Sequence, residues 1–322
     1  MNRRPGPALP DAAPQANDWA RTPERSNPLA LRLMRWIALA GGRRVARWLL
    51  HPITLYFVLF APTPVRHSRR YLTRALGHPA RWRDVYRHFF SFTATILDRV
   101  YLLSDRLDRF EVQVQGEPLI TATLAEGRGA FLVGAHLGSF EVLRAVGQQR
   151  SGLRIAMVMY PDNARLINQA LQAVAPHYRP HIIALGRRDS MLAVRDWLDS
   201  GGLAGVLADR ALGEASGRAG SVVQRFLGVE ARFSDGPFRL AAMLKRRVIF
   251  MVGLYRGGNR YEVRFETLAD FSVASAGAST QEREQSIRDA VQAYAHRLEA
   301  LCREAPFNWF NFHDFWTEES IT

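Results

Sequence analysis

His136 is the side chain best placed for chemistry in this sequence of 322 residues. It follows a short apolar run, Ala130 to Val133, that is typical of a buried strand, and an amphipathic helical pattern begins at Ser139. The imidazole therefore lies in a strand-to-helix turn flanked by glycine, where a substrate can approach the backbone closely. Glu141 follows in the first helical turn, and its carboxylate, folded back, would orient the imidazole as a general base. The alternative is a loop histidine beside a glutamate that the helix dipole favours.

A histidine, four residues and an acidic residue after an apolar strand resemble the first block of the glycerolipid acyltransferase superfamily. The segment Gly-Ala-His-Leu-Gly-Ser-Phe-Glu is most similar to the late acyltransferases of lipid A biosynthesis. Further blocks that resemble this family follow in the same order: a strand-ending Asp209, the segment 226–228, Pro237 at the start of a helix and an aromatic closing segment, 306–316. Several blocks in order are far more specific than one.

The resemblance implies transfer of a fatty acyl chain from a thioester to a hydroxyl of a membrane lipid or glycolipid, lipid A or another lipid. His136 and Glu141 would be the catalytic pair, and the hydroxyl would attack directly, without an acyl-enzyme. The expected substrate-binding residues are Gly138, Ser139, Tyr160, Asn163, Arg165, Asp209, Arg210 and Arg225. The oxyanion would be stabilised by backbone N–H groups of the turn 134–139 or by an arginine. Acyl carrier protein or coenzyme A would carry the acyl group as co-substrate, and neither a metal site nor a resident cofactor is expected.

Three departures from the family pattern leave the acceptor open. Arg165 is displaced from its usual place after the strand, and the segment 226–228 reads Phe-Leu-Gly, where many relatives repeat the phenylalanine. The closing segment has His313 and Asp314 in place of basic residues. These differences favour a divergent member of the family that acts on lipid A, on another membrane lipid or on a lipid-like pigment.

The chain is strongly basic, with a formal net charge of +13 and a pI near 10.8. This charge favours anionic partners, namely an anionic membrane surface and the acidic acyl carrier protein. The sequence has no nucleic-acid-binding signature, so nucleic acid is not expected as a partner. Cys302 is the only cysteine, which excludes a disulfide framework within the chain and a cysteine-based metal site.

Composition divides the chain into three regions. Residues 1–28 are rich in proline and predict a disordered tail, 29–110 an N-terminal helical membrane-associating region, and 111–322 an acyltransferase α/β core. The apolar run 48–62 is shorter than the roughly 20 residues of a spanning helix and contains Pro52. An interfacial helix is therefore favoured, with a spanning helix and a hydrophobic hairpin as alternatives. The expected location is the cytoplasmic face of the bacterial inner membrane.

The core alternates strand and helix patterns, which predicts a mostly parallel central sheet flanked by helices. Strands are expected at 110–114, 130–135, 153–160, 181–185, 203–208, 248–255 and 260–267, the last two as a hairpin, and helices within 65–108 and at 139–149, 164–174, 188–200 and 237–246. Ligands of such sheets gather at the carboxyl ends of the strands, where His136, Tyr160 and Asp209 are expected.

Two other classes of protein compete with this hypothesis. A serine hydrolase would need Gly-x-Ser-x-Gly at the turn, and the surroundings of Ser139 lack the second glycine. A non-catalytic basic protein that docks on membranes would explain the charge and the N-terminal region. It would give no reason for His136 and Glu141 at the end of a strand.

Overall fold

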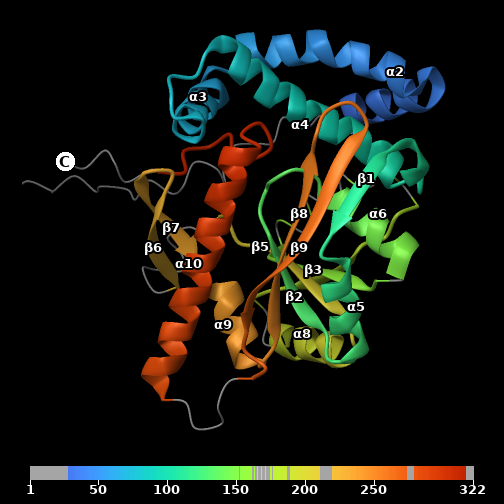
Figure 1. Cartoon of the computed structure of the whole chain (residues 1–322). Helices are drawn as coiled ribbons and strands as arrows, with labels where there is room; N and C mark the ends of the chain where they lie inside the picture. Colours follow the sequence, from blue (N-terminus) through green and yellow to red (C-terminus); the bar gives the residue numbers. More distant parts are fainter. Residues whose placement is uncertain are drawn as a thin grey trace, which may run out of the picture.

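The structure is a computed structural model, and it describes residues 28–316 except 152, 187–188, 211–219, 274–278 and scattered positions between 162 and 176. Within this part the chain forms a mostly parallel seven-stranded sheet with helices around it (Figure 1). The predicted α/β fold class is confirmed. The predicted tail, residues 1–28, lies outside the described residues apart from Pro28. The division of the rest at residue 110 stays a prediction.

The central strands of the sheet run parallel, so their carboxyl ends share one edge. The strands are β1 (Glu111–Gln115), β2 (Ala130–Gly134), β3 (Ile155–Met159), β4 (His181–Ala184), β5 (Leu203–Leu207), β8 (Arg247–Tyr255) and β9 (Arg260–Asp270), in the order β1-β9-β8-β2-β5-β3-β4. Neighbours from β8 to β4 are parallel, whereas β9 is antiparallel to β8 and parallel to β1. The predicted strands and the late hairpin are confirmed, and β2 and β5 lie side by side.

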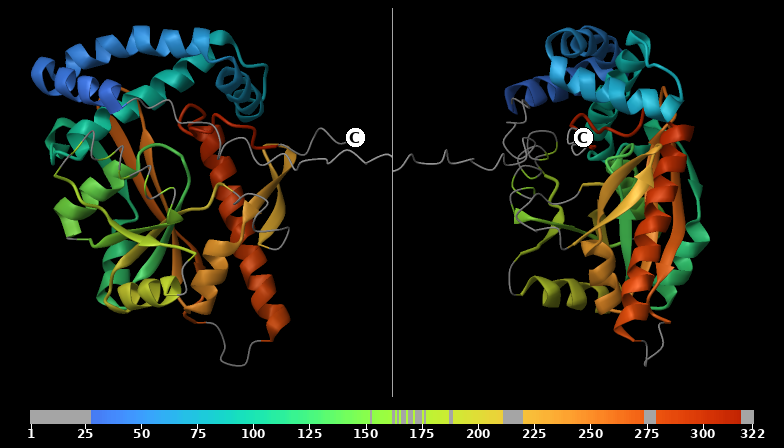
Figure 2. Two further views of the ribbon diagram at one scale, coloured as in Figure 1. Left: turned by 180° about the vertical axis from the view of Figure 1, so that it is seen from behind. Right: turned by 90° about the vertical axis from the view of Figure 1, so that its left-hand side faces the viewer.

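Three N-terminal helices lie across the carboxyl edge of the central strands (Figures 1 and 2). They are α2 (Pro28–Phe60), α3 (Pro62–Leu76) and α4 (Trp82–Leu102), and a 3-10 turn at Leu107–Arg109 leads into β1. The helical pattern predicted within 65–108 is divided because Gly77, at φ +73°, ends α3 in the left-handed conformation.

The remaining helices accompany the sheet. They are α5 (Glu117–Ala125), α6 (Phe140–Ser151), α8 (Ser190–Asp199), α9 (Gly236–Met243) and α10 (Thr280–Glu304). Helices α6, α8 and α9 confirm predictions, whereas α5 was not predicted. In the predicted helix 164–174, the described residues Arg165, Asn168 and Leu171 are helical.

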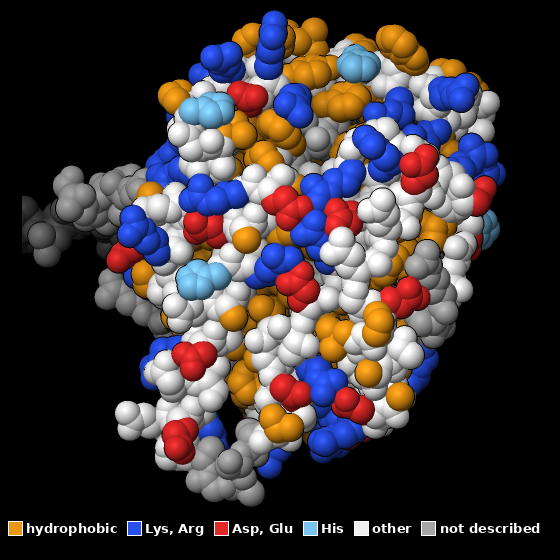
Figure 3. All heavy atoms as spheres, viewed as in Figure 1, with side chains coloured by type: hydrophobic (Ala, Val, Ile, Leu, Met, Phe, Trp, Pro, Cys, Tyr) orange, Lys and Arg blue, Asp and Glu red, His pale blue; other side chains and the backbone are white. Residues whose placement is uncertain are grey.

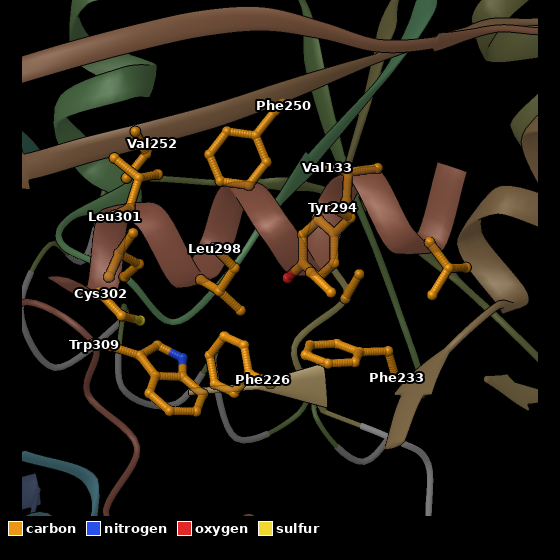
Figure 4. Packing of buried hydrophobic residues seen from close by; sticks show 14 of the residues in the cluster. Val133, Phe226, Phe233, Phe250, Val252, Tyr294, Leu298, Leu301, Cys302 and Trp309 are labelled. Carbon is orange, nitrogen blue, oxygen red and sulfur yellow. The ribbon is translucent and has the colours of Figure 1, made fainter. Parts of the chain in front are cut away.

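The hydrophobic core occupies both faces of the sheet because side chains alternate along each strand. Phe131 and Val133 of β2 pack with Tyr294 and other side chains of α10, as Figure 4 shows for Val133 and Tyr294. The next side chain along, Leu132, packs on the other face with residues of α4 and α6. The N-terminal helices therefore contribute side chains to the core cluster on each face of the sheet.

A second, two-stranded sheet packs beside α10. Its strands are β6 (Ser221–Phe226) and β7 (Val229–Ser234), which pair in antiparallel register. The turn between them puts Leu227 at φ +52° and Gly228 at φ +88°, and the Leu227 N–H donates to the carboxylate of Glu299 at 2.7 Å. No strands were predicted here, and the segment 226–228 proves to be the end of β6 and its turn.

Helix α2 presents a broad apolar surface to the outside of the molecule. Trp36, Trp48, Leu59 and Phe60 are each more than 60% exposed. The helix kinks at Gly42, where φ is +77°. Among the described residues no single helix is both long and apolar enough to cross a membrane. The helices Trp36–Phe60 and Pro62–Leu76, which are bent by 95° relative to each other, reach the required length and apolar character only when taken together.

A buried ion pair fixes α2 to the rest of the fold. The guanidinium of Arg43 donates to both carboxylate oxygens of Asp98 on α4, at 2.8 and 2.9 Å. The hydroxyl of Tyr261 on β9 donates to the same carboxylate at 2.9 Å. Because Asp98 is fully buried, loss of either donor would leave a desolvated charge incompletely paired, which is strongly destabilising.

Candidate active site

His136 and Asp209 form a hydrogen-bonded pair at the carboxyl ends of the adjacent strands β2 and β5. The Nδ1–H of His136 donates to Oδ1 of Asp209 at 2.9 Å, and the backbone N–H of His136 donates to Oδ2 at 2.9 Å. A carboxylate only accepts, so the imidazole must carry its proton on Nδ1 when neutral. Nε2 is left as the basic nitrogen, and no described residue hydrogen-bonds to it. With its side chain 32% exposed, His136 remains accessible to a substrate.

Asp209 is a buried anion held by donors from three directions. The indole N–H of Trp309 adds a hydrogen bond to Oδ2 at 2.9 Å, and Asp209 is only 2% exposed. Burial alone would raise the pKa of the Asp209 carboxyl, but the charges of His136 and Arg210 and the hydrogen bonds from His136 and Trp309 hold the pKa well below its usual range. Asp209 is therefore ionised at neutral pH and stabilises a protonated imidazole beside it.

The closing segment 306–316 holds the histidine turn in place. The backbone N–H of Gly138 donates to the carbonyl of Asn308, and the N–H of Phe310 donates to the carbonyl of His136, each at 2.8 Å. The side-chain amide of Asn308 is itself fixed by Tyr255: its Oδ1 accepts from the backbone N–H of Tyr255 at 2.7 Å, and its Nδ2–H donates to the carbonyl of Tyr255 at 3.1 Å. The far C-terminal part of the described chain thus sets the position of the catalytic candidate.

The predicted contact between His136 and Glu141 is wrong. Glu141 instead forms an ion pair with Arg99 of α4, with Nε and Oε1 2.7 Å apart, and accepts a hydrogen bond from the Ser139 hydroxyl at 3.2 Å. The helix that carries Glu141 packs against α4, so the carboxylate faces the N-terminal helices while Asp209 occupies Nδ1 of His136. Glu141 therefore links α6 to α4 at the edge of the site.

Three of the backbone donors expected for an oxyanion, the N–H groups of His136, Gly138 and Ser139, are already used. The N–H of Ser139 donates to the carbonyl of Gly253 at 2.8 Å, and those of His136 and Gly138 donate to Asp209 and Asn308. The Ser139 side chain is 2% exposed and hydrogen-bonds to Glu141 rather than to His136. Ser139 thus lacks the contact between nucleophile and base that a serine hydrolase needs.

The other predicted binding residues lie at different distances from this centre. Arg210 follows Asp209 directly and is close enough for its charge to lower the pKa of that carboxyl. Tyr160 is 37% exposed and follows β3, two strands from β2, with Asn163 half-buried and Arg165 exposed in the helical stretch beyond. Arg225 lies on β6 and lines a cavity beside α10 together with Glu299 and Arg303. Their roles stay predictions.

Sequence reasoning missed Trp309 as a site residue, and for His313 it favoured a packing role over a second catalytic pair with Asp314. Trp309 was seen only as part of an aromatic segment, and nothing local indicates that its indole reaches Asp209, 100 residues earlier. His313 is near enough for the charges of Arg210, Asp209 and His136 to act on it. Burial first, then the charge of Arg210, lowers its pKa to about 4. A neutral imidazole thus lies beside the site at neutral pH.

Among the described residues no three His, Cys, Asp or Glu side chains converge as metal ligands.

Gly138 cannot carry a side chain in this turn. Its φ is +73°, and a Cβ atom would lie 2.1 Å from the carbonyl oxygen of Gly253. The clash is between the Cβ and a backbone atom, so no rotamer relieves it. We expect Gly138→Ala to cost about 3 kcal/mol of folding free energy and to displace His136, with at least a tenfold loss of activity as an order of magnitude.

Gly77→Ala is the matched control for this prediction. Gly77 has the same φ of +73° but open space around its Cβ position. Gly77→Ala should therefore lower the free energy of unfolding by only about 1 kcal/mol, the penalty for an alanine in the left-handed backbone conformation. Thermal unfolding of both variants measures the difference, and equal costs would contradict the clash.

Buried His88 connects α3 and α4 to the closing segment. Its Nε2–H donates to the carbonyl of Trp309 at 2.8 Å, and Nδ1 accepts from the Ser68 hydroxyl at 2.8 Å. Burial lowers the pKa of His88 to about 4, although the bond to Trp309 opposes the shift. His88 is therefore neutral in the folded protein at neutral pH.

The stability of the protein should fall on acidification because of His88. The unfolded chain gains a proton at His88 with a pKa near 6.5 and the folded chain only near 4, so stability is lost as the pH falls between these values. Between pH 7 and pH 5 we expect this group to lower the free energy of unfolding by about 2 kcal/mol. Denaturant unfolding at both pH values measures it. In His88→Gln, whose amide can still donate to Trp309, this part of the pH dependence should disappear, whereas an unchanged slope would contradict the assignment.

The fold and the site define an α/β protein with a hydrogen-bonded histidine–aspartate pair at the carboxyl edge of its sheet. The model of the family described as bacterial lipid A biosynthesis acyltransferase matches residues 36–318 of the chain. The protein therefore belongs to that family and is an acyltransferase of the type that carries out late acylation of lipid A. This confirms the resemblance found in the sequence blocks. A comparison with individual curated proteins found no match.

Proposed function

We propose that this acyltransferase moves a fatty acyl chain from a thioester donor to a hydroxyl of a membrane lipid or glycolipid, with His136 as general base. The observation that carries the proposal is the His136–Asp209 pair, which leaves Nε2 basic and open to a substrate. A buried, ionised carboxylate fixes the ring and offsets the charge it gains. The role of base is thus assigned to His136 and that of orienting carboxylate to Asp209 instead of Glu141.

The reaction proceeds in one displacement. Nε2 of His136 takes the proton of the acceptor hydroxyl as its oxygen bonds to the thioester carbonyl carbon. The tetrahedral intermediate then collapses with cleavage of the C–S bond, and the imidazolium returns the proton to the leaving thiolate. No acyl-enzyme forms, which accords with the buried position of Ser139 and the full burial of Cys302.

Arg210 is the side chain proposed to stabilise the oxyanion. The backbone N–H groups of His136, Gly138 and Ser139 donate elsewhere, which favours the other expected kind of donor, an arginine, and Arg210 lies beside Asp209. Mutation of Arg210 to lysine would keep the charge but lose the planar fork of donors.

The donor and the location follow from the charge and from the surface of α2. The net charge of +13 favours an acidic acyl carrier protein as the donor, because opposite charges attract. Coenzyme A is the alternative carrier. The apolar exposed side of α2 suits attachment to the cytoplasmic face of the bacterial inner membrane, where the acceptor resides. A non-catalytic membrane protein would have no use for the His136–Asp209 pair.

The test is acyl transfer by the purified full chain to total bacterial membrane lipid. Labelled acyl carrier protein and labelled acyl coenzyme A are supplied in separate reactions, and lipid A precursors are compared with phospholipids as acceptors. A labelled lipid identified by mass spectrometry supports the proposal and names the acceptor. Release of free fatty acid without labelled lipid would indicate a hydrolase, and no release of label from either donor would contradict catalysis.

A further inference from the structure

An open cavity of about 640 Å³ lies at the corner between α3 and α4 and is lined mainly by arginine. Arg69 comes from α3, and Arg81 and Arg83 stand at the start of α4, together with Ala80 and Trp82. The His136–Asp209 pair does not contribute to it. The cavity is therefore separate from the proposed catalytic centre.

No described carboxylate neutralises the three guanidinium groups of this cavity. Arg69, Arg81 and Arg83 form no ion pair among the described residues, and Arg83 only lies over the ring of Trp82, 5.8 Å from its centroid. The carboxylate of Asp84 accepts the backbone N–H of Arg81 and caps the helix. Like charges that converge on one cavity without a carboxylate paired to any of them favour an anionic ligand, and guanidinium groups suit phosphate by geometry.

A second basic cavity in the molecule lacks this property. It measures about 550 Å³ and is lined by Arg225, Gly228, His296, Glu299, Ala300 and Arg303. There Glu299 pairs with Arg303 at 2.9 Å and also accepts the N–H of Leu227, so the cavity contains its own anion. The arginine cavity of α3 and α4 is thus the better candidate for an external phosphate.

The arginine cavity borders the apolar surface of α2. Figures 1 and 2 place the start of α4 beside the end of α2, and Figure 3 shows hydrophobic side chains along this side of the molecule with basic side chains, which are arginines, among them. Phe60 at the end of α2 is 63% exposed and Trp82 at the start of α4 is 61% exposed. Exposed aromatic rings beside arginine match the boundary between acyl chains and headgroups of a bilayer.

We propose that Arg69, Arg81 and Arg83 form a binding site for the phosphate of an anionic phospholipid headgroup, with Trp82 inserted at the level of the headgroups. This site would orient the protein so that the exposed side of α2 lies on the membrane. The inference rests on the proposed function only in placing the acceptor in a membrane. Binding to lipid needs no acyl donor, so it can be tested apart from catalysis.

The experiment measures binding of the purified full chain to vesicles in the absence of donor. Vesicles of phosphatidylcholine alone are compared with vesicles that also contain phosphatidylglycerol. The variant Arg69→Gln/Arg81→Gln/Arg83→Gln should bind the anionic vesicles about 10²-fold more weakly than wild type, at about fivefold for each arginine near the surface. The control Arg195→Gln/Arg283→Gln/Arg288→Gln removes the same charge from α8 and the start of α10, at the opposite end of the molecule (Figure 1).

Each outcome decides the proposal. The proposal is supported if the control variant binds anionic vesicles within about twofold of wild type, because charges much farther than about 10 Å from the lipid are screened. It also requires that Trp82→Ala weakens binding to both kinds of vesicle. Equal losses in the two triple variants would overturn it, since only net charge would then matter. A third outcome is that inorganic phosphate binds in the cavity at matched ionic strength while the protein shows no preference for anionic vesicles. This result would assign the site to a soluble phosphate and overturn the proposed lipid ligand.

Discussion

His136→Ala is expected to lower kcat for acyl transfer by about 10² to 10⁴-fold, the usual contribution of a general base. Alanine leaves the acceptor hydroxyl without a group to take its proton. KM for the donor should change little, because Nε2 acts on the acceptor proton and not on the thioester chain. Steady-state kinetics with the donor and acceptor identified by the transfer assay measure both constants.

The fold should tolerate this substitution better than it tolerates a change in the core. The His136 side chain is 32% exposed, and its backbone hydrogen bonds to Asp209 and Phe310 do not need the imidazole. His78→Ala, at an exposed histidine outside the site, is the control and should keep full activity. A His136→Ala protein that is folded and retains more than about a tenth of the activity would exclude the imidazole as base.

Asp209→Asn should be at least as damaging, lowering kcat by about 10³ to 10⁴-fold, because it changes the tautomer of His136. Oδ2 of Asp209 accepts from two donors, the backbone N–H of His136 and the indole N–H of Trp309, so the amide oxygen of asparagine is held at that position. The amide NH₂ then faces Nδ1 and donates to it. Nδ1 must accept, the proton moves to Nε2, and the nitrogen that faces the substrate is no longer basic.

Glu141→Gln is the matched control for Asp209→Asn. It removes one carboxylate charge from the first turn of α6, five residues after His136, and the amide oxygen can still accept from the Ser139 hydroxyl. We expect a loss of less than about tenfold, since only the partly exposed ion pair with Arg99 is weakened. If Glu141→Gln proved as inactive as Asp209→Asn, the predicted His136–Glu141 pair would form in the working enzyme and the assignment to Asp209 would be wrong.

Local patterns in the sequence predicted most of the core elements. Side-chain alternation, apolar runs and turn residues act over a few neighbours, so β2, β5 and the hairpin of β8 and β9 were found close to their observed bounds. The turn between β6 and β7 was not predicted because Leu227 adopts a positive φ, which residues with a side chain rarely do. The tertiary hydrogen bond from the Leu227 N–H to the carboxylate of Glu299 and the packing of Phe226 stabilise that conformation.

The sequence by itself determined that a histidine stands in a tight turn after a buried strand, and that the ordered blocks belong to an acyltransferase family. It also placed Asp209 among the site residues. It did not determine which carboxylate orients His136, because that depends on the strand order that brings β5 beside β2 across 73 residues. Glu141, five residues away, is turned by its helix toward Arg99. Packing of distant segments, including Trp309 against Asp209, decided the chemistry because hydrogen-bond partners are fixed by distance in space and not by distance along the chain.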